Sequence, residues 1–381
     1  MKVLVLGAGQ LARMMALAGA PLGIKVVAYD VRSHTTVHPV TWENQQLTLI
    51  QALLDADVVS AEFEHIPEDI LTESEASGKF LPGAVAIKAG GDRRIEKQLL
   101  DEVAVPNAKY SIINSQQDLV LACEDIGLPL VLKSALDGYD GKGQWRVKQL
   151  SEIESVWSEI EEFLSNSRKE QAIIAEQWIA FDREISVIGA RSRDGSFSIY
   201  PLTHNHHESG VLALSVAPAD KGSLHNQALD AFKKISEALD YVGVLAIEFF
   251  DLEGQLLVNE IAPRVHNSGH WTQQGALVCQ FENHLRAVCG LALGSMDLLR
   301  PTAMINLLGI DSLPEAIYSM HDTHIHWYGK EKRPGRKMGH INIRAENKTA
   351  LLAQLNAVAQ CLPESEFSGL TEAIESWSQA S

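Results

Sequence analysis

Short apolar runs alternate with helical patterns along the first part of the chain. The apolar runs lie at residues 3–6, 25–29 and 58–59, and the helical patterns lie at 11–17 and 47–54. Such alternation is typical of β-strands connected by α-helices, the unit that builds parallel sheets. The pattern therefore predicts a parallel α/β domain that ends near residue 90, where Gly90-Gly91-Asp92 precedes a charged helical stretch at 93–102.

The middle of the chain has a different pattern, in which turn signals separate closely spaced strands. Strand-like runs lie at 130–133, 172–176, 184–190, 197–202, 244–250 and 255–260, with a helical pattern at 227–239. Asp194-Gly195 and Gly254 lie between neighbouring runs, as expected for hairpins. We predict a mixed region with antiparallel pairing, interrupted by a polar, glycine-rich loop at 137–143.

After Pro301 the chain contains short strand-like runs and a final helical pattern at 348–360. A length of 381 residues fits two or three domains of ordinary size. We predict an N-terminal Rossmann-like α/β domain at 1–90, a central domain at 91–300 with a smaller lid subdomain at about 105–178, and a C-terminal domain at 301–381.

Composition and charge narrow the classes of function. With 46% hydrophobic and 21% charged residues the chain can form packed cores, which excludes wholesale disorder. A net charge of −17 repels nucleic acids and anionic membranes, so we expect neither as a partner. The four cysteines form no CxxC pair, and no leader or membrane-spanning stretch is evident. We therefore expect a cytoplasmic protein without a zinc site.

A glycine motif, Gly7-Ala8-Gly9-Gln10-Leu11-Ala12, follows the first predicted strand and opens the first helix. With Asp30 at the end of the second strand, it satisfies the dinucleotide-binding fingerprint. Glycines at such a turn also let other phosphates approach the N–H groups of the helix N-terminus. The motif thus leaves three hypotheses open: an NAD-dependent dehydrogenase, another phosphate site, or a tight turn without a ligand.

A second glycine-rich segment, 138–143, follows Lys133 at the end of a predicted strand. Its glycines free the backbone to fold over phosphates, and Lys133 and Lys142 supply positive charge. The spacing is not that of a Walker A loop. Taken alone, the segment fits a solvated loop better than a phosphate lid.

Glu248 and Glu260 lie in neighbouring predicted strands, with Asn259 beside the second. If the connecting turn places them opposite each other, both carboxylates face one side of the sheet. Two converging carboxylates repel unless a cation lies between them, which indicates Mg²⁺ bound with nucleotide phosphates. A salt bridge to Lys or Arg is the alternative.

Two further segments are rich in hydrogen-bond donors and positive charge. Residues 264–272 contain Arg264, His266, His270 and Trp271, a set that suits a small oxyanion. Residues 330–337 form the densest basic cluster of the chain and are a candidate phosphate site. A polar loop and a solvated basic loop are the alternatives, and the second of these is slightly favoured.

Taken together, these segments resemble the N5-carboxyaminoimidazole ribonucleotide synthetase family of ATP-grasp ligases. The resemblance covers nearly the whole chain and is carried by residues 7–14, 138–144, 201–205, 259–260, 266–272 and 333–340. It implies an ATP-grasp fold that joins an N-terminal parallel α/β domain to mixed α+β regions. It also implies ATP- and Mg²⁺-dependent carboxylation of 5-aminoimidazole ribonucleotide by bicarbonate through carboxyphosphate, a step of purine biosynthesis, in a homodimer.

The resemblance assigns roles to individual residues. Catalytic roles fall to Arg264, His266, Asp140 and Lys142. ATP contacts fall to Arg93, Lys133, Gly138, Tyr139, Asp140, Gly141, Lys142, Gly143, Gln144, Glu176, Gln177, Trp178, Ile179, Glu184, His207, Asn259 and Glu260. Ribonucleotide contacts fall to Gly9, Gln10, Leu11, Asp140, Lys330, Arg336 and Lys337. Mg²⁺ falls to Glu248 and Glu260.

The sequence departs from the family pattern at a few positions. Ala12 and Asp137 stand where the family has glycine, and Ala262 stands where many other ATP-grasp enzymes have a metal-binding Asn. Other ATP-grasp carboxylases or ribonucleotide ligases share Glu248, Glu260 and the lid loop. A dehydrogenase leaves the other segments without a role, and a nucleotide-binding regulator without catalysis is disfavoured by Glu248, Glu260 and Arg264.

Overall fold

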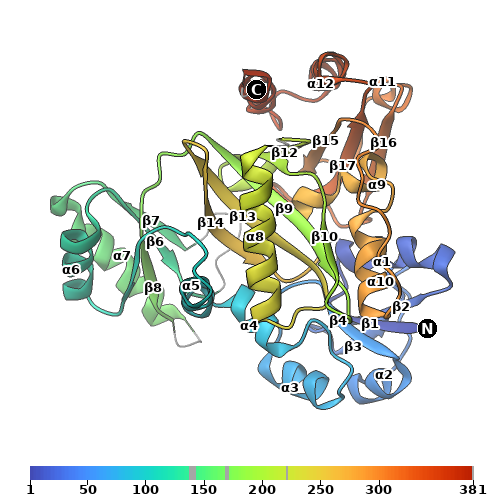
Figure 1. Cartoon of the computed structure of the whole chain (residues 1–381), viewed down its shortest axis with the longest axis horizontal. Helices are drawn as coiled ribbons and strands as arrows, with labels where there is room; N and C mark the ends of the chain where they lie inside the picture. The colour runs from blue at the N-terminus through green and yellow to red at the C-terminus, as the bar shows by residue number, and fades with distance from the viewer. Residues whose placement is uncertain (137–142, 168–170, 220–221, 380–381) are drawn as a thin grey trace.

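The computed structural model describes residues 1–136, 143–167, 171–219 and 222–379, and these residues form three β-sheets. Figure 1 shows the N-terminal sheet in blue, a small sheet in green and a large sheet that carries the rest of the chain. None of the helices in the described ranges is long and apolar enough to cross a membrane.

The N-terminal region is the predicted α/β unit. Its elements are β1 (Lys2–Leu6), α1 (Gln10–Gly19), β2 (Lys25–Asp30), β3 (Thr35–Val37), α2 (Leu49–Asp55), β4 (Val58–Ala61), α3 (Glu68–Ala76) and α4 (Ala84–Gly91). Strand β1 pairs in parallel with β2 and β4, which confirms the parallel arrangement. Strand β3, which we did not predict, adds an antiparallel edge. Strand β1 is buried on both faces of the sheet, which explains why it is almost wholly apolar.

The small sheet is antiparallel, with strand order β5-β8-β6-β7. This region comprises α5 (Arg93–Glu102), β5 (Tyr110–Ile113), α6 (Gln116–Ile126), β6 (Leu130–Ser134), β7 (Gln144–Val147), α7 (Ile153–Asn166) and β8 (Ile173–Gln177). The glycine-rich segment connects β6 to β7, and residues 137–142 of it lie outside the described ranges. At its base, the Ser134 N–H donates to the Gly143 carbonyl at 2.8 Å.

The large sheet has nine strands, with β10 paired to β9 beside the main order β14-β13-β9-β11-β12-β15-β17-β16. Its strands are β9 (Arg183–Arg191), β10 (Phe197–Ile199), β11 (Thr203–Glu208), β12 (Val211–Ala217), β13 (Gly243–Leu252), β14 (Gln255–Ala262), β15 (Thr302–Leu308), β16 (Thr323–Trp327) and β17 (Lys337–Arg344). Its helices are α8 (Ser223–Ala238), α9 (Thr272–Gly275), α10 (Gln280–Val288), α11 (Glu315–Tyr318), α12 (Lys348–Cys361) and α13 (Leu370–Gln379).

Helix α8 crosses one face of this sheet (Figure 1). Its apolar side chains recur at helical spacing, so Phe232 and Ile235 are fully buried in one core cluster with Leu245 and Ile247 of β13. Strands β12 and β15 pair directly, so the strands after residue 301 continue the central sheet. The C-terminal region therefore contributes to the surroundings of the same site.

Candidate active site

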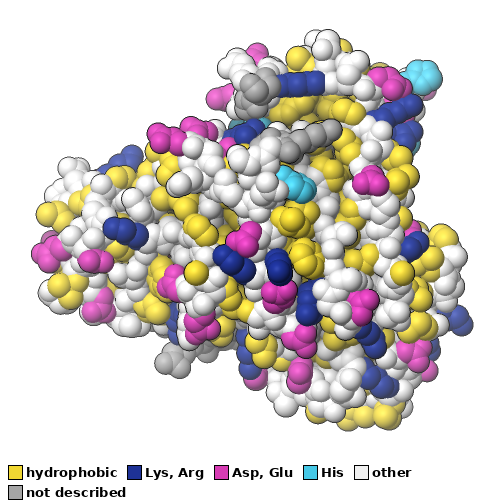
Figure 2. All heavy atoms as spheres, viewed as in Figure 1, with side chains coloured by type: hydrophobic (Ala, Val, Ile, Leu, Met, Phe, Trp, Pro, Cys, Tyr) yellow, Lys and Arg dark blue, Asp and Glu magenta, His cyan; other side chains and the backbone are white. Residues whose placement is uncertain are grey.

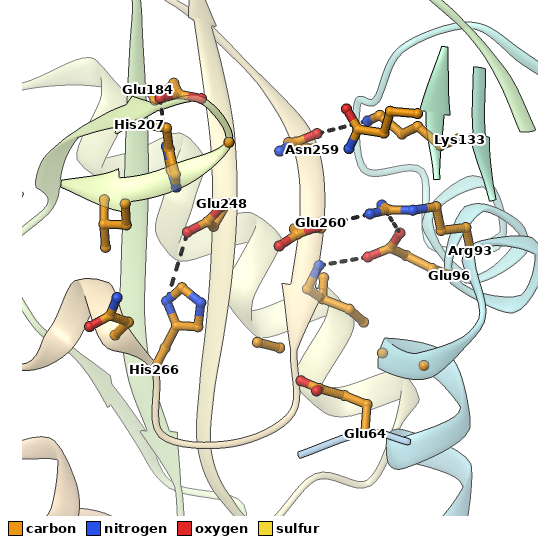
Figure 3. A pocket seen from close by; sticks show the side chains of 18 of the residues that line it. Glu64, Arg93, Glu96, Lys133, Glu184, His207, Glu248, Asn259, Glu260 and His266 are labelled. Carbon is orange, nitrogen blue, oxygen red and sulfur yellow. Dashed lines mark hydrogen bonds and ion pairs between the residues drawn. The ribbon is translucent and has the colours of Figure 1, made fainter. Parts of the chain in front are cut away.

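A cavity of about 820 Å³ is lined by residues of the small and large sheets and by α1 and loop residues beside the N-terminal sheet. Figure 3 shows how the charged side chains point into it from both sides. The predicted residues that line it are Gln10, Leu11, Arg93, Lys133, Gln144, Glu176, Gln177, Trp178, Ile179, Glu184, His207, Glu248, Asn259, Glu260, Arg264, His266 and Lys337. The tertiary structure thus gathers into one place residues that are far apart in the sequence.

The remaining predicted residues are placed differently. Gly9 contacts the lining residue Glu62, and Lys330 contacts the lining residue Gln10. Arg336 donates to the Glu331 carbonyl at 2.9 Å and does not line the cavity. Gly143, with φ of +66°, closes the base of the glycine-rich loop. Gly138, Tyr139, Asp140, Gly141 and Lys142 lie outside the described residues.

Glu248 and Glu260 are direct partners across the β13–β14 pair, beside a β-bulge after Glu248. Burial raises the pKa of Glu248 to about 7. For Glu260, burial acts in the same direction, but Arg93, Lys133 and His207 together outweigh it and lower the pKa. The Arg93 side chain donates to Glu260 Oε2 at 3.2 Å, whereas the buried Glu248 Oε1 has no hydrogen-bond partner. One carboxylate is therefore already neutralised and the other is left for a cation.

The wall of the cavity that faces Glu248 and Glu260 carries positively charged side chains. Lys133 Nζ lies 2.7 Å from Glu176 Oε2 and 3.1 Å from Asn259 Oδ1. The fully buried Lys97 Nζ lies 3.3 Å from the other Glu176 oxygen. Burial acts to raise the pKa of Glu176, but Lys133, Lys97 and Arg93 together lower it to about 2. Glu176 is thus the counter-ion of these cations, and sequence reasoning missed Lys97.

His207 carries a positive charge on the other side of Glu248. Its Nδ1 lies 2.7 Å from Glu184 Oε2. Burial acts to lower the pKa of His207, yet the Glu184 hydrogen bond and the Glu248 charge raise it to about 9. Figure 3 shows His207 directed at Glu248. The register of β11 and β12 shifts between His206 and His207, where Ala213 of β12 is the extra residue, and this irregularity helps to aim the His207 side chain.

Arg264 and His266 lie beyond Glu248, in the loop after β14. Arg264 Nε is 2.7 Å from Glu64 Oε1. Burial keeps the pKa of His266 well below its ordinary value, so the imidazole is neutral. The Ser268 N–H donates to His266 Nδ1 at 3.3 Å, which leaves the proton on Nε2. This corner therefore offers a cation and a neutral N–H donor.

The N–H groups of the glycine motif bind a carboxylate of the protein itself, which the sequence analysis did not predict. Glu62, which follows β4, accepts hydrogen bonds from the Gly9 N–H and, at 2.8 Å, from the Ala12 N–H. A Cβ atom at Gly9 would lie 2.7 Å from Glu62 Oε1, so the Glu62 carboxylate would have to move away from the motif. These N–H groups hold a carboxylate of the protein itself. A useful signal was the position of Glu62 and Glu64 directly after a parallel strand, where sites of open α/β sheets form.

Asp30 takes no part in this cavity. Its carboxylate accepts from the Arg32 N–H and the Ser33 hydroxyl, both at 2.9 Å, within its own turn. A dinucleotide ribose would need this carboxylate free. The second half of the dinucleotide fingerprint is therefore a local turn. Arg32, two residues on, lines the cavity instead and was not predicted.

Comparison with known proteins agrees with this geometry. The chain matches the ribonucleotide synthetase preATP-grasp domain over residues 1–90, the ATP-grasp domain over 98–281 and the phosphoribosylaminoimidazole carboxylase C-terminal domain over 302–354. The fold and the cavity between its sheets are those of an ATP-grasp enzyme.

Individual relatives identify the group more narrowly. The N5-carboxyaminoimidazole ribonucleotide synthase of Vibrio cholerae is 59% identical over 367 residues, which cover 96% of this chain and 97% of that protein. The crystal structure of the Thermus thermophilus synthetase has a TM-score of 0.83 at 36% identity and covers 95% of this chain and 99% of its own. The chain belongs to the N5-carboxyaminoimidazole ribonucleotide synthase family.

Several solved relatives contain bound nucleotides. The synthase of Aspergillus clavatus, in complex with ADP and 5-aminoimidazole ribonucleotide, has a TM-score of 0.81 at 28% identity, over 98% of both chains. The dehydrogenase hypothesis is excluded by this family membership, as are the other ATP-grasp carboxylases.

Proposed function

We propose that this chain carboxylates the exocyclic amine of 5-aminoimidazole ribonucleotide with bicarbonate and converts ATP to ADP and phosphate. The observation that carries the proposal is a single cavity with two chemically different ends. One end combines cations with the facing pair Glu248 and Glu260, and the other is lined by Gln10, Leu11 and Lys337. Family membership and the ligands of the Aspergillus clavatus relative support the same assignment.

The reaction consists of two transfers. A bicarbonate oxygen attacks the γ-phosphorus of ATP, the bond to the β-phosphate oxygen breaks, and ADP leaves with carboxyphosphate as the product. The ribonucleotide amine then forms a bond to the carboxyl carbon, while the bond from that carbon to the phosphate oxygen breaks. One amine proton is released, and phosphate is the second leaving group. Holding both substrates in one cavity supplies the proximity that this sequence of two transfers needs.

The nucleotide would lie between the small sheet and the large sheet. Arg93 and Lys133 are suited to the phosphates, because their charges already face the cavity. Apolar side chains for the base are Val131, Ile179, Phe181 and Phe250, and the last two stack with ring centroids 4.5 Å apart. We assign the base edge to the backbone of residues 176–179 and the ribose to Glu184.

Mg²⁺ is implied by the family, and the residues present fit it. Glu248 Oε1, which has no hydrogen-bond partner and lies 3.8 Å from His266 Nδ1, and the facing Glu260 are hard oxygen donors, which Mg²⁺ prefers. No cluster of three or more potential ligands forms among the residues that the structure describes. Phosphates and water would complete the coordination. When bound, the ion neutralises phosphate charge during transfer.

Arg264 and His266 are suited to the carboxyphosphate. The Arg264 guanidinium supplies charge for the oxyanion, and a neutral His266 can donate from Nε2 without repelling Arg264. Glu64 holds Arg264 in place at 2.7 Å. The ribonucleotide phosphate would be bound by Lys330, Arg336 and Lys337, with Gly9, Gln10 and Leu11 beside it. Asp140 and Lys142 would complete the site from the glycine-rich loop.

The deciding experiment is a test of substrate dependence. ADP release from Mg·ATP with bicarbonate should require 5-aminoimidazole ribonucleotide and should match the loss of its free amine. ADP release that is indifferent to the ribonucleotide would contradict the proposed reaction. 5-Aminoimidazole riboside in place of the ribonucleotide is a suitable control, because it keeps the amine and lacks only the phosphate.

We also propose the organisation of the protein: domains at 1–90, 91–300 and 301–381, a lid at about 105–178, and a cytoplasmic homodimer. The match of the N-terminal and C-terminal families to residues 1–90 and 302–354 supports the division. On the face shown in Figure 2, acidic and basic side chains are interspersed, which fits small-molecule substrates better than a nucleic acid. Light scattering would establish the number of subunits.

A further inference from the structure

Tyr328 lies in the connection between β16 and β17, next to the basic segment 330–337. The side chain is almost completely buried, with 1% of the residue exposed. Its hydroxyl lies 2.7 Å from His340 Nδ1. The Lys330 ammonium lies 5.4 Å from the centroid of its ring. Tyr328 therefore contacts a buried histidine at its hydroxyl and a lysine of the proposed substrate site at its ring.

His340 is fixed from several directions. Its Nε2 lies 2.9 Å from the carbonyl oxygen Oε1 of Gln273, so Nε2 carries the proton and Nδ1 accepts from the Tyr328 hydroxyl. The His326 ring stacks on it with centroids 4.4 Å apart, and His270 lies 4.9 Å away. A buried histidine held in this way is a rigid anchor for the tyrosine hydroxyl.

Lys330 extends from this anchored ring to the N-terminal region. Its ammonium donates to Gln10 Oε1, and Gln10 lines the cavity. It also lies 3.4 Å from the Lys337 carbonyl. A lysine side chain has four rotatable bonds and loses conformational freedom when it is held in place. An aromatic face under the ammonium lowers that loss and adds a cation–π attraction.

We infer that Tyr328, anchored by His340, is a positioning residue that holds the Lys330 ammonium at the ribonucleotide end of the cavity. This inference rests on the proposed function, because it assumes that Lys330 contacts the ribonucleotide phosphate. Tyr328 itself does not line the cavity. It acts through Lys330, so its loss should affect binding of the ribonucleotide rather than binding of ATP.

The experiment compares Tyr328→Phe, Lys330→Met and the double variant. Tyr328→Phe keeps the ring but releases it from His340. We expect it to raise KM for 5-aminoimidazole ribonucleotide by about 3- to 10-fold, with KM for ATP and kcat near the wild-type values. In the Lys330→Met background, where no ammonium remains to be positioned, the same change should have no further effect on KM.

Tyr241→Phe is the matched control. Tyr241 is fully buried, its hydroxyl donates to the Val244 carbonyl at 2.6 Å, and it lies outside the cavity lining. The Tyr241→Phe variant loses a comparable buried hydrogen bond. Any general effect of lower stability on KM would therefore appear in both Tyr241→Phe and Tyr328→Phe. His340→Gln removes the imidazole acceptor of the Tyr328 hydroxyl and should reproduce the rise in KM for the ribonucleotide.

The outcomes separate this inference from the function on which it rests. If wild-type ADP release is independent of the ribonucleotide, the proposed function is wrong and the inference falls with it. If the wild type is active but Tyr328→Phe behaves like Tyr241→Phe, only the positioning role is wrong. Additive effects of Tyr328→Phe and Lys330→Met would overturn it as well, because they would show that the tyrosine does not act through the lysine.

Discussion

Glu248 and Glu260 face each other across one strand pair, yet their surroundings differ. Arg93 lowers the pKa of Glu260 against the effect of burial, whereas burial raises the pKa of Glu248 to about 7. Two fully ionised carboxylates on directly facing residues would repel each other without a cation. We therefore expect Glu248 to lose its proton and become fully negative when a cation and the nucleotide bind.

We expect Glu260→Gln to reduce ATP turnover by about 100-fold or more, because the neutral amide is a poor ligand for Mg²⁺. The thermal midpoint should also fall, but less than turnover does, because the amide can still accept from Arg93 although it no longer carries the opposite charge. Steady-state ADP release and thermal melting measure the two effects. Glu237→Gln, at an exposed position of α8, is the control. Turnover of Glu260→Gln close to that of the wild type would refute the metal-binding role.

At Gly9, a single added Cβ atom would change the contact with Glu62. We expect Gly9→Ala to displace Glu62, because the added Cβ would lie 2.7 Å from Glu62 Oε1. Overpacking of this kind costs about 1 to 3 kcal/mol, and KM for the ribonucleotide should rise. Urea unfolding and kinetics in Gly9→Ala, Glu62→Ala and the double variant measure this. The cost of the alanine should be smaller where Glu62 is absent; an equal cost would mean that the contact is not the cause.

Helix α5 links the small sheet to the metal-binding strand. Arg93 at its start pairs with Glu260, and one turn later Glu96 accepts the Ile261 N–H at 2.6 Å. The helix is held at its N-terminus by Asp92, which caps the Arg94 N–H at 2.9 Å. Arg93 and Glu96 are therefore buried because both contact β14, and Lys97 of the same helix contacts Glu176 of β8.

Helix α10 is tied to two sheets by one neutral histidine. The Val244 N–H of β13 donates to His284 Nδ1 at 3.1 Å, so Nε2 donates to Ser60 Oγ of β4 at 2.8 Å. Burial lowers the pKa of His284 to about 4. A group whose pKa is depressed on folding stabilises the protein above its unfolded pKa and loses that contribution as the pH falls. The relevant window therefore runs from about 6.5 down to 4.

We expect wild-type stability to fall across this window, with His284 contributing about 3 kcal/mol. His284→Gln can keep both hydrogen bonds but cannot be protonated, so its stability should fall less steeply. Urea unfolding between pH 7 and 4 measures the difference. His321→Gln, at an exposed position, is the control. Parallel curves for the wild type and His284→Gln would contradict the assignment.

The cavity is lined by residues of the N-terminal region, the small sheet and the large sheet, so its ligands contact all three parts of the molecule. A ligand that binds only the folded protein stabilises it by about 2.7 kcal/mol at 100 times its dissociation constant. We expect Mg·ADP to raise the thermal midpoint and to slow proteolysis of the small sheet. The Lys133→Met variant, which loses a cation of the cavity wall, should show a reduced effect at the same concentration. No shift with Mg·ADP in the wild type would argue against nucleotide binding here.

The alternation of apolar and polar residues was sufficient to predict the parallel N-terminal unit and most central strands. These signals are local, because burial on both faces of β1 and one face of α8 selects side chains at fixed spacing. The chemistry of Glu248, Glu260, Lys133 and Arg264 was also visible as residue types. Family motifs brought them together, and the cavity lining agrees with that grouping.

Tertiary structure alone decided the rest. The Glu62 carboxylate at the glycine motif, the Lys97 contact with Glu176 and the Tyr328–His340 pair join residues that no local pattern connects. The continuation of the central sheet into β15 likewise depends on strand pairing across a long stretch of chain. Long-range pairing and the burial of charge arise only when distant segments meet, because both depend on neighbours in space rather than on neighbours in sequence.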